Sequence, residues 1–363
     1  MKKLLLFGVL VAAVSCQPSS FTVNGTVENA DNEGETVYMS ELYSGKKLDS
    51  AIVAQGKFTF TRNIPDTLLL YQVSIGRASA LFIPEGGDIT LEIPARYTSF
   101  AVSGTPLNDT ISKCDATLKA EYDRLVALFE KVDEYPVGSA ERDSANAEYQ
   151  KAVPVYRELT QRTKTDIFNN NKDNLVGLYM LESIVNGGDY TSNGIDSLLA
   201  LVSAPKTIEY DRIVNIRDRK VAEESTNVGK HYLDVEGVDI NGNPVKLSDF
   251  AGKGKWVVVD FWASWCGPCR AAMPHLKDIY KAYKKKGLNV VGVNISERNS
   301  EDFKKAVKDL DLPWPMIHTM ERKAADTYGI VGIPTIILIN PDGQIVMRTH
   351  NGQEVVNKVK EVL

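Results

Sequence analysis

The sequence has few cysteines, few histidines and little net charge. Four cysteines among 363 residues are too few for the disulfide framework that stabilises small secreted domains. The net charge of −5 indicates neither a nucleic-acid-binding surface nor a disordered acidic tail, so we expect no nucleic-acid partner. The chain length and the ordinary balance of apolar and charged residues predict two or three folded domains.

Long apolar runs are also rare, and the one that stands out lies at the N-terminus. Lys2 and Lys3 precede the apolar run Leu4 to Val14, which is too short to span a bilayer as a permanent helix. Small residues follow it, and together these features predict an export signal over residues 1–15. No later segment reaches about 18 uninterrupted apolar residues, so we expect no transmembrane helix.

Cys16 follows the predicted signal directly. Val14-Ser15-Cys16 resembles a bacterial lipobox, in which the cysteine is lipidated and becomes the mature N-terminus, although Ala13 stands where a Leu is usual. The alternative is an ordinary secreted protein with a free thiol at Cys16, which is a liability in an oxidising compartment. We therefore predict a lipid-anchor tether over 16–20 and a periplasm-facing position in the cell envelope.

Two regions without a catalytic constellation follow. Short alternating apolar runs separated by Gly, Asn, Asp and Pro clusters predict an antiparallel β domain over 21–105. This stretch resembles the small β domain of unknown function that often precedes a redox domain in exported lipoproteins. Helical periodicity then predicts a helical segment over 106–224, with a break at Pro154. Cys114 lies there without another Cys or His nearby in sequence, so we interpret it as a structural thiol.

Strands and helices alternate in the last third, after a predicted linker at 225–229. An entry hairpin, βαβ units, a second hairpin and a closing helix predict a mixed sheet flanked by helices over 228–363. The strand 256–262 is buried, and Ser300 is expected to cap a helix over 300–310.

The chemistry is expected where the strand 256–262 meets the next helix. There Cys266-Gly267-Pro268-Cys269 places two cysteines in a first helical turn, where they can close a disulfide with little backbone movement. Free N–H groups and the helix dipole favour a thiolate at such a position. We predict that Cys266 is the exposed nucleophile, that Cys269 is the shielded resolving thiol, and that Gly267 and Pro268 tune the couple.

Half of a zinc site is the main rival interpretation of two cysteines at this spacing. A structural zinc site needs two further ligands. The chain has no second Cys-X-X-Cys, and its four histidines show no ligand spacing. We therefore expect no metal, and no cofactor beyond the redox-active Cys266–Cys269 disulfide.

Cys266-Gly267-Pro268-Cys269, with Val259-Asp260-Phe261-Trp262-Ala263 before it, resembles thioredoxin. The segment from Tyr328 to Thr335 resembles the second signature of that family. The resemblance implies a cis peptide bond before Pro334. It also implies that Trp265, Ile333 and Pro334 form the substrate-binding rim. A lone carboxylate inside an apolar strand should have a raised pKa, and the resemblance gives Asp260 the role of deprotonating Cys269.

The export signal, the entry hairpin and the longer stretch between the two signatures resemble membrane-anchored reductases of the TlpA/ResA type. This resemblance implies thiols or disulfides of exported proteins as partners, apocytochromes of cytochrome c biogenesis among them, and a membrane-embedded electron donor. Two positions depart from the families. Ala272 replaces a glutamate of the ResA-like group, and Gly292 stands where thioredoxins place a lysine.

The sequence leaves three alternatives to a disulfide reductase open. A disulfide oxidase or isomerase would use the same two cysteines, but their disulfide would have a different reduction potential. A peroxidase would share the fold and the entry hairpin. A binding module in the first 224 residues could instead carry the main function, with the redox domain as an accessory.

Overall fold

The computed structural model describes residues 19–94, 101–297, 299–319 and 322–363. It divides into two compact units, one containing the residues up to 189 together with 198–213, the other 190–197 together with 214–363. Cys16 and the predicted signal peptide lie outside the described residues. Within the described ranges, no helix has both the length and the apolar character needed to cross a bilayer.

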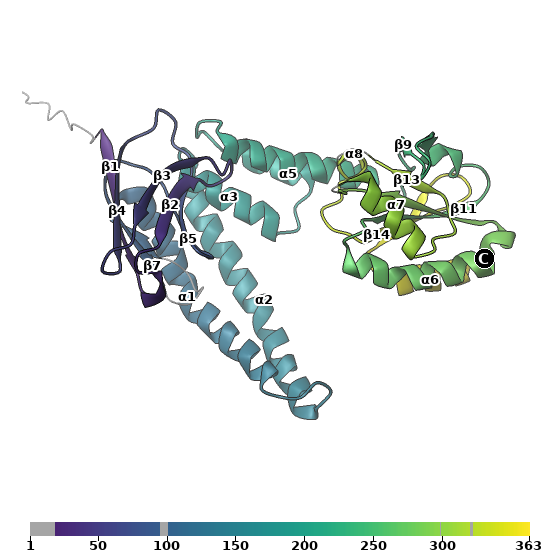
Figure 1. Cartoon of the computed structure of the whole chain (residues 1–363), viewed down its shortest axis with the longest axis horizontal. Coiled ribbons are helices and arrows are strands. Elements are labelled where there is room, and N and C mark those ends of the chain that lie inside the picture. The colour runs from purple at the N-terminus through teal and green to yellow at the C-terminus, as the bar shows by residue number, and fades with distance from the viewer. Residues whose placement is uncertain (1–18, 95–100, 298, 320–321) are drawn as a thin grey trace, which may run out of the picture. The chain divides into compact units, whose positions relative to one another are not determined.

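Two four-stranded sheets form the β region of the first unit (Figure 1). Their orders are β4-β1-β7-β8 and β3-β2-β5-β6. The strands are β1 Ser20–Val27, β2 Thr36–Glu41, β3 Lys47–Ile52, β4 Lys57–Asn63, β5 Tyr71–Ile75, β6 Ala78–Phe82, β7 Gly87–Ile93 and β8 Ala101–Ser103. The predicted β region is confirmed with one difference: β1 and β7 pair in parallel, whereas the other pairs are antiparallel. These two strands are joined through most of the region rather than by a hairpin, which allows the parallel pairing.

Five helices follow in the described chain: α1 Pro106–Asp133, α2 Ala140–Asn169, α3 Leu175–Gly187, α4 Ser192–Leu199 and α5 Ile208–Ser225. The long helices α1 and α2 lie side by side (Figure 1). The predicted break at Pro154 is wrong, because α2 continues through this residue. Ring contacts of α1 with α2 lie on both sides of Pro154, at Tyr149 and at Tyr156, and this packing compensates for the lost backbone hydrogen bond.

A seven-stranded mixed sheet with the order β10-β9-β13-β12-β11-β14-β15 forms the centre of the second unit. Its strands are β9 Glu236–Val238, β10 Pro244–Lys246, β11 Trp256–Trp262, β12 Leu288–Asn294, β13 Met316–His318, β14 Thr335–Ile339 and β15 Ile345–Thr349. Strands β11, β12 and β13 are mutually parallel, and β14 and β15 are antiparallel additions at one side. The mixed sheet predicted from the sequence is therefore present.

Helices cover both faces of this sheet: α6 Gly267–Tyr283, α7 Ser300–Asp309, α8 Lys323–Thr327 and α9 Gly352–Val362. One buried cluster joins α6, α7 and α9 to the sheet and contains both cysteines. A second cluster joins α8 and the entry segment to the opposite face. The predicted cap of α7 is wrong by one residue, since the side chain of Asn299, not Ser300, accepts the capping bond from Asp302 N–H.

The predicted linker at 225–229 is packed rather than free. Helix α5 runs to Ser225, and the next residue, Thr226, is fully buried. The Thr226 hydroxyl lies 3.2 Å from Nη1 of Arg348, whose Nη2 donates to the Tyr328 carbonyl. The last turns of α5 are thus part of the second unit.

Candidate active site

The two cysteines at the head of α6 are bonded to each other. Their sulfurs are 1.97 Å apart and their Cα atoms 5.3 Å apart. Cys266 occupies the N-cap position of α6, and its sulfur accepts a hydrogen bond of 3.1 Å from the Cys269 backbone N–H. The sulfur takes the place of the capping oxygen that usually accepts a hydrogen bond from a free backbone N–H of the first helical turn. The same donor would stabilise a Cys266 thiolate in the reduced protein.

The sequence produces this geometry in three steps. The apolar run of β11 is buried between β12 and β14 and ends at Trp262. Ala263 to Trp265 then turn the chain out of the sheet, and the Cys266 N–H bonds back to the Ala263 carbonyl. Pro268 in the first turn of α6 suits the helix start, because it has no N–H to leave unpaired. Gly267 and Pro268 are both exposed.

Cys266 is less exposed than the sequence led us to expect. The residue is 4% exposed, against 0% for Cys269. The loop before β14 covers it, since its sulfur lies 3.7 Å from the carbonyl oxygen of Ile333. It nevertheless remains the more exposed of the two cysteines.

The residues predicted to form the rim lie around Cys266. The peptide bond Ile333-Pro334 is cis, and Ile333 is half-buried. Trp265 is 57% exposed, and its indole N–H donates to the Ser296 carbonyl at 3.0 Å. Val331, which the sequence reasoning did not single out, is 77% exposed in the same loop as Ile333. Trp265, next to Cys266 in sequence, and Val331, in the loop that covers Cys266, are thus exposed apolar side chains.

Asp260 is fully buried in β11, and neither of its carboxylate oxygens has a hydrogen-bond partner among the described residues. Burial raises the pKa of this carboxyl to about 7. Strand alternation puts its side chain on the same face as Val258 and Trp262, which belong to the buried cluster that contains Cys269. This arrangement provides a group that can exchange a proton near neutral pH behind the disulfide.

A polar network that the sequence reasoning missed lies beside the cysteines. Glu297, after β12, accepts hydrogen bonds from Ser264, and Asn294 connects it to His318 at the end of β13. The available signal was positional, because these residues follow the carboxyl ends of adjacent parallel strands, where α/β proteins place their sites.

Packing explains the two departures from the resembling families. Gly292 pairs with Asp260 across β11 and β12, and a Cβ atom there would meet the Met316 sulfur at less than contact distance. A lysine has no room at this position. Ala272 on α6 lies against Gly352 at the start of α9, where a Cβ would come within 3.1 Å of the Ala272 Cβ. The start of α9 thus occupies the space that a longer side chain at position 272 would need.

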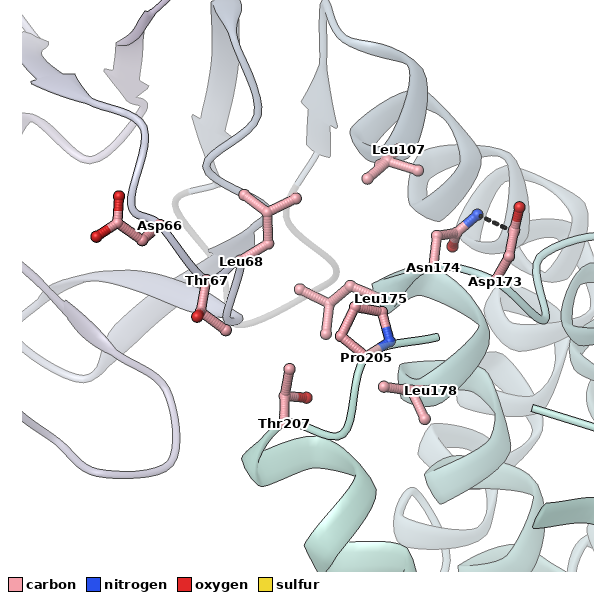
Figure 2. Close-up of a pocket in the computed structure, with 10 residues that line it drawn as sticks. All are labelled: Asp66, Thr67, Leu68, Leu107, Asp173, Asn174, Leu175, Leu178, Pro205 and Thr207. Carbon is pink, nitrogen blue, oxygen red and sulfur yellow. Dashed lines mark hydrogen bonds between the residues drawn. The ribbon is translucent and has the colours of Figure 1, made fainter. Parts of the chain in front are cut away.

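The first unit contains a separate hollow of about 310 Å³, shown in Figure 2. Leu68, Leu175 and Leu178 are among the apolar residues that line it. Two of its polar residues already have structural partners: Asn174 caps α3, and Thr207 donates to Glu209. No cysteine lines this hollow, and among the described residues no cluster could hold a metal ion.

Comparison with known proteins places these observations in a family. The AhpC/TSA family model matches residues 228–348. A thiol–disulfide oxidoreductase ResA from Bacillus thuringiensis is 32% identical over 141 residues, which are 39% of this chain and 79% of the relative. The chain belongs to the ResA family of thiol–disulfide oxidoreductases. The ResA of Bacillus subtilis is 35% identical over 124 residues, which are 34% of this chain and 68% of that protein.

The ResA-like part of the chain is therefore a thioredoxin-like α/β domain with thiol:disulfide oxidoreductase activity, as the sequence predicted. Among solved structures, the thioredoxin domain of an oxidoreductase from Bacteroides vulgatus is 37% identical with a TM-score of 0.36, covering 38% of this chain and 97% of that domain. A second family model, a domain of unknown function (DUF4369), matches residues 21–111.

Proposed function

We propose that this ResA-family protein reduces disulfides of exported proteins by dithiol exchange through Cys266 and Cys269. One observation carries the proposal: the Cys266 sulfur is the N-cap of α6, accepts the Cys269 N–H bond, and lies 3.7 Å from the Ile333 carbonyl oxygen. This is the setting in which a thiolate is stabilised, and the thiolate is the form of cysteine that attacks a disulfide.

The proposed reaction starts from the reduced protein. The Cys266 thiolate attacks one sulfur of the substrate disulfide and forms a mixed disulfide, and the other substrate sulfur leaves as a thiolate. Cys269 then loses its proton to the Asp260 carboxylate and attacks the Cys266 sulfur. The second substrate thiolate leaves, and two electrons have passed from the dithiol to the substrate. The Cys266–Cys269 disulfide is the oxidised product and serves as the redox group of the enzyme.

The rim residues are proposed to hold the substrate. Trp265 and Val331 offer exposed apolar surface, and the backbone of Ile333 beside Cys266 can pair with an extended segment in strand fashion. Pro334 has no N–H, so it adds no further donor at this point. An unfolded or extended segment of an exported protein fits such a surface.

The cellular setting follows from the N-terminal sequence. The signal over 1–15 and the lipobox-like Cys16 support a lipid-anchored protein in the cell envelope that faces the periplasm. A dithiol donor embedded in the membrane would regenerate the reduced form. Apocytochromes of cytochrome c biogenesis, whose disulfides would be reduced to thiols, are the substrate class that the family resemblance favours.

A trapping experiment tests the mechanism. Changing Cys269 to Ala removes the resolving thiol, so the mixed disulfide with Cys266 should accumulate and be visible on non-reducing gels. Cys266→Ser is the matched control and should trap nothing. Trapping by Cys266→Ser but not by Cys269→Ala would contradict the assigned roles.

The match to the AhpC/TSA family keeps a peroxidase as a second candidate. Dithiol exchange requires both cysteines, whereas a peroxidatic thiol can react alone. Rapid peroxide consumption that survives Cys269→Ser would favour the peroxidase. A reduction potential as high as about −120 mV would instead favour a disulfide oxidase.

A further inference from the structure

The loop that carries Cys266 is held from the side by one carboxylate. Glu297 accepts two hydrogen bonds from Ser264, one from the backbone N–H at 2.5 Å and one from the hydroxyl at 2.8 Å. Ser264 precedes Cys266 by two residues. The bond from the backbone N–H fixes the path of the chain itself, just before it enters α6.

The carboxylate is anchored to the sheet behind it. Asn294 is fully buried at the end of β12, and its amide N–H donates to Glu297 at 2.7 Å. Its amide oxygen lies 2.7 Å from Nδ1 of His318, which must therefore carry the proton. The His318 ring stacks on Phe303 at 4.8 Å and is nearly parallel to it. The network thus links the ends of β11, β12 and β13.

The loop after β12, which contains Glu297, also orients Trp265, the exposed aromatic residue of the rim. The Trp265 indole N–H donates to the Ser296 carbonyl, immediately before Glu297. Ser296 has a φ of 58°, in the left-handed region that non-glycine residues seldom adopt. Ser296 and Glu297 therefore hold two consecutive residues of the catalytic loop, Ser264 and Trp265.

A carboxylate is the group that suits this position. Three donors converge on it: two from Ser264 and one from Asn294. A carboxylate only accepts hydrogen bonds, so it satisfies all three donors, whereas an uncharged glutamine could keep the same contacts only by donating its amide N–H to the Ser264 hydroxyl. Because it bonds to Ser264, two residues before Cys266, its negative charge also lies next to the loop that leads into α6, where it opposes the charge of a thiolate.

We infer that Glu297 is a positioning residue for the exchange reaction, which fixes Ser264 and Trp265 and makes the cysteine couple more reducing. This inference rests on the proposed function of Cys266 and Cys269. Stabilising a thiolate favours the reduced form, and a nearby carboxylate acts against this stabilisation. Loss of the carboxylate should therefore make the couple more oxidising.

The test compares three variants of the full chain with the wild type. Glu297→Gln removes the charge and reverses the bond with the Ser264 hydroxyl, which can accept from the new amide N–H. Ser264→Ala removes one hydrogen bond and keeps the charge. Glu301→Gln on α7 is the control, because it makes the same chemical change at a side chain that is 79% exposed and contacts Lys304. Each is equilibrated in a glutathione redox buffer and assayed for reduction of insulin disulfides.

We expect Glu297→Gln to shift the thiol–disulfide equilibrium about tenfold toward the reduced form, equivalent to about 30 mV. It should also lower kcat/KM for insulin about tenfold and change the NMR signal of the Trp265 indole N–H. Ser264→Ala should lower kcat/KM several-fold with an unchanged equilibrium. Glu301→Gln should behave as the wild type.

Wild-type values for Glu297→Gln in both assays would overturn the inference while leaving the proposed function intact. If Glu297→Gln does not fold, the comparison of Ser264→Ala with the wild type decides, and an unchanged kcat/KM would overturn the inference. A wild-type protein that neither titrates as a dithiol nor reduces insulin would refute the proposed function, and the inference with it.

Discussion

Asp260 combines two properties that rarely occur together, full burial and an unpartnered carboxyl group. A buried polar group without a partner costs free energy, and the cost is larger for its charged form. Its pKa of about 7 places the change of charge within the range where the enzyme would work. The stability of the protein should therefore report on this residue directly.

Replacing Asp260 by Asn should stabilise the oxidised protein at alkaline pH. The folded-state pKa of about 7 lies above the ordinary value of 3.8, so the stability due to the neutral form is complete below pH 3.8 and is lost as pH rises through 7. We expect the free energy of unfolding at pH 8 to increase by up to roughly 4 kcal/mol in the variant, and to change little at pH 3.5. Urea unfolding at both pH values measures this, and an equal effect at both would contradict the pKa.

The same substitution tests the proposed role of Asp260 in catalysis. Without an ionisable group at position 260, Cys269 has no nearby base in β11, so the mixed disulfide should resolve more slowly at pH 7. Stopped-flow measurement of substrate release, compared with the wild type, gives the rate. A rate equal to that of the wild type would leave Asp260 with a purely structural effect.

At the scale of elements, the close approach of β12 to its neighbours decides which side chains can lie next to Asp260. The backbone of Gly292 is opposite Asp260, with Met316 and Trp262 packed over it. The absence of a side chain is thus a packing requirement of β11, β12 and β13 together.

Gly292→Ala should destabilise the protein by about 1–3 kcal/mol, because the new methyl group must displace buried side chains. Its Cβ would also lie 3.1 Å from the Trp262 indole nitrogen. Gly187→Ala is the matched control, since Gly187 lies in α3 with no atom within 4 Å of the added Cβ. Thermal unfolding of both variants measures the difference, and equal stability would show that Met316 can move at little cost.

At the scale of the whole molecule, the boundary before the thioredoxin-like domain matters. The matched ResA relatives align with 34–39% of this chain, and the AhpC/TSA model matches residues 228–348. The last turns of α5 nevertheless pack on that region: a Cβ on Gly329, whose φ is 59°, would meet the Arg219 carbonyl and Glu223. These turns therefore contribute to the stability of the domain.

A fragment of residues 214–363 should be more stable than one of residues 228–363. The shorter fragment loses Thr226, which leaves the half-buried Arg348 with one hydrogen bond fewer, and exposes the surface that α5 covers. We expect a loss of about 1–3 kcal/mol, measured by urea unfolding. Both fragments should reduce insulin at similar rates, because the cysteine site lies wholly within them. Equal stability would show that α5 adds nothing.

The sequence by itself determined the local setting of the two cysteines. The spacing of Cys266 and Cys269, an apolar strand before them and a helix after them predict two sulfurs within bonding distance at a helix start, because strand alternation, helix periodicity and helix-end electrostatics are local properties of the chain. The same local rules predicted the mixed sheet and the β region.

Tertiary structure alone decided the rest. The covering of Cys266 by the Ile333 loop, the contact of Glu297 with Ser264, the lack of space at Gly292 and the continuous α2 all depend on segments distant in sequence. A local pattern carries no information about which partner will pack against it. The physical reason is that packing and hydrogen-bond satisfaction are properties of the assembled core.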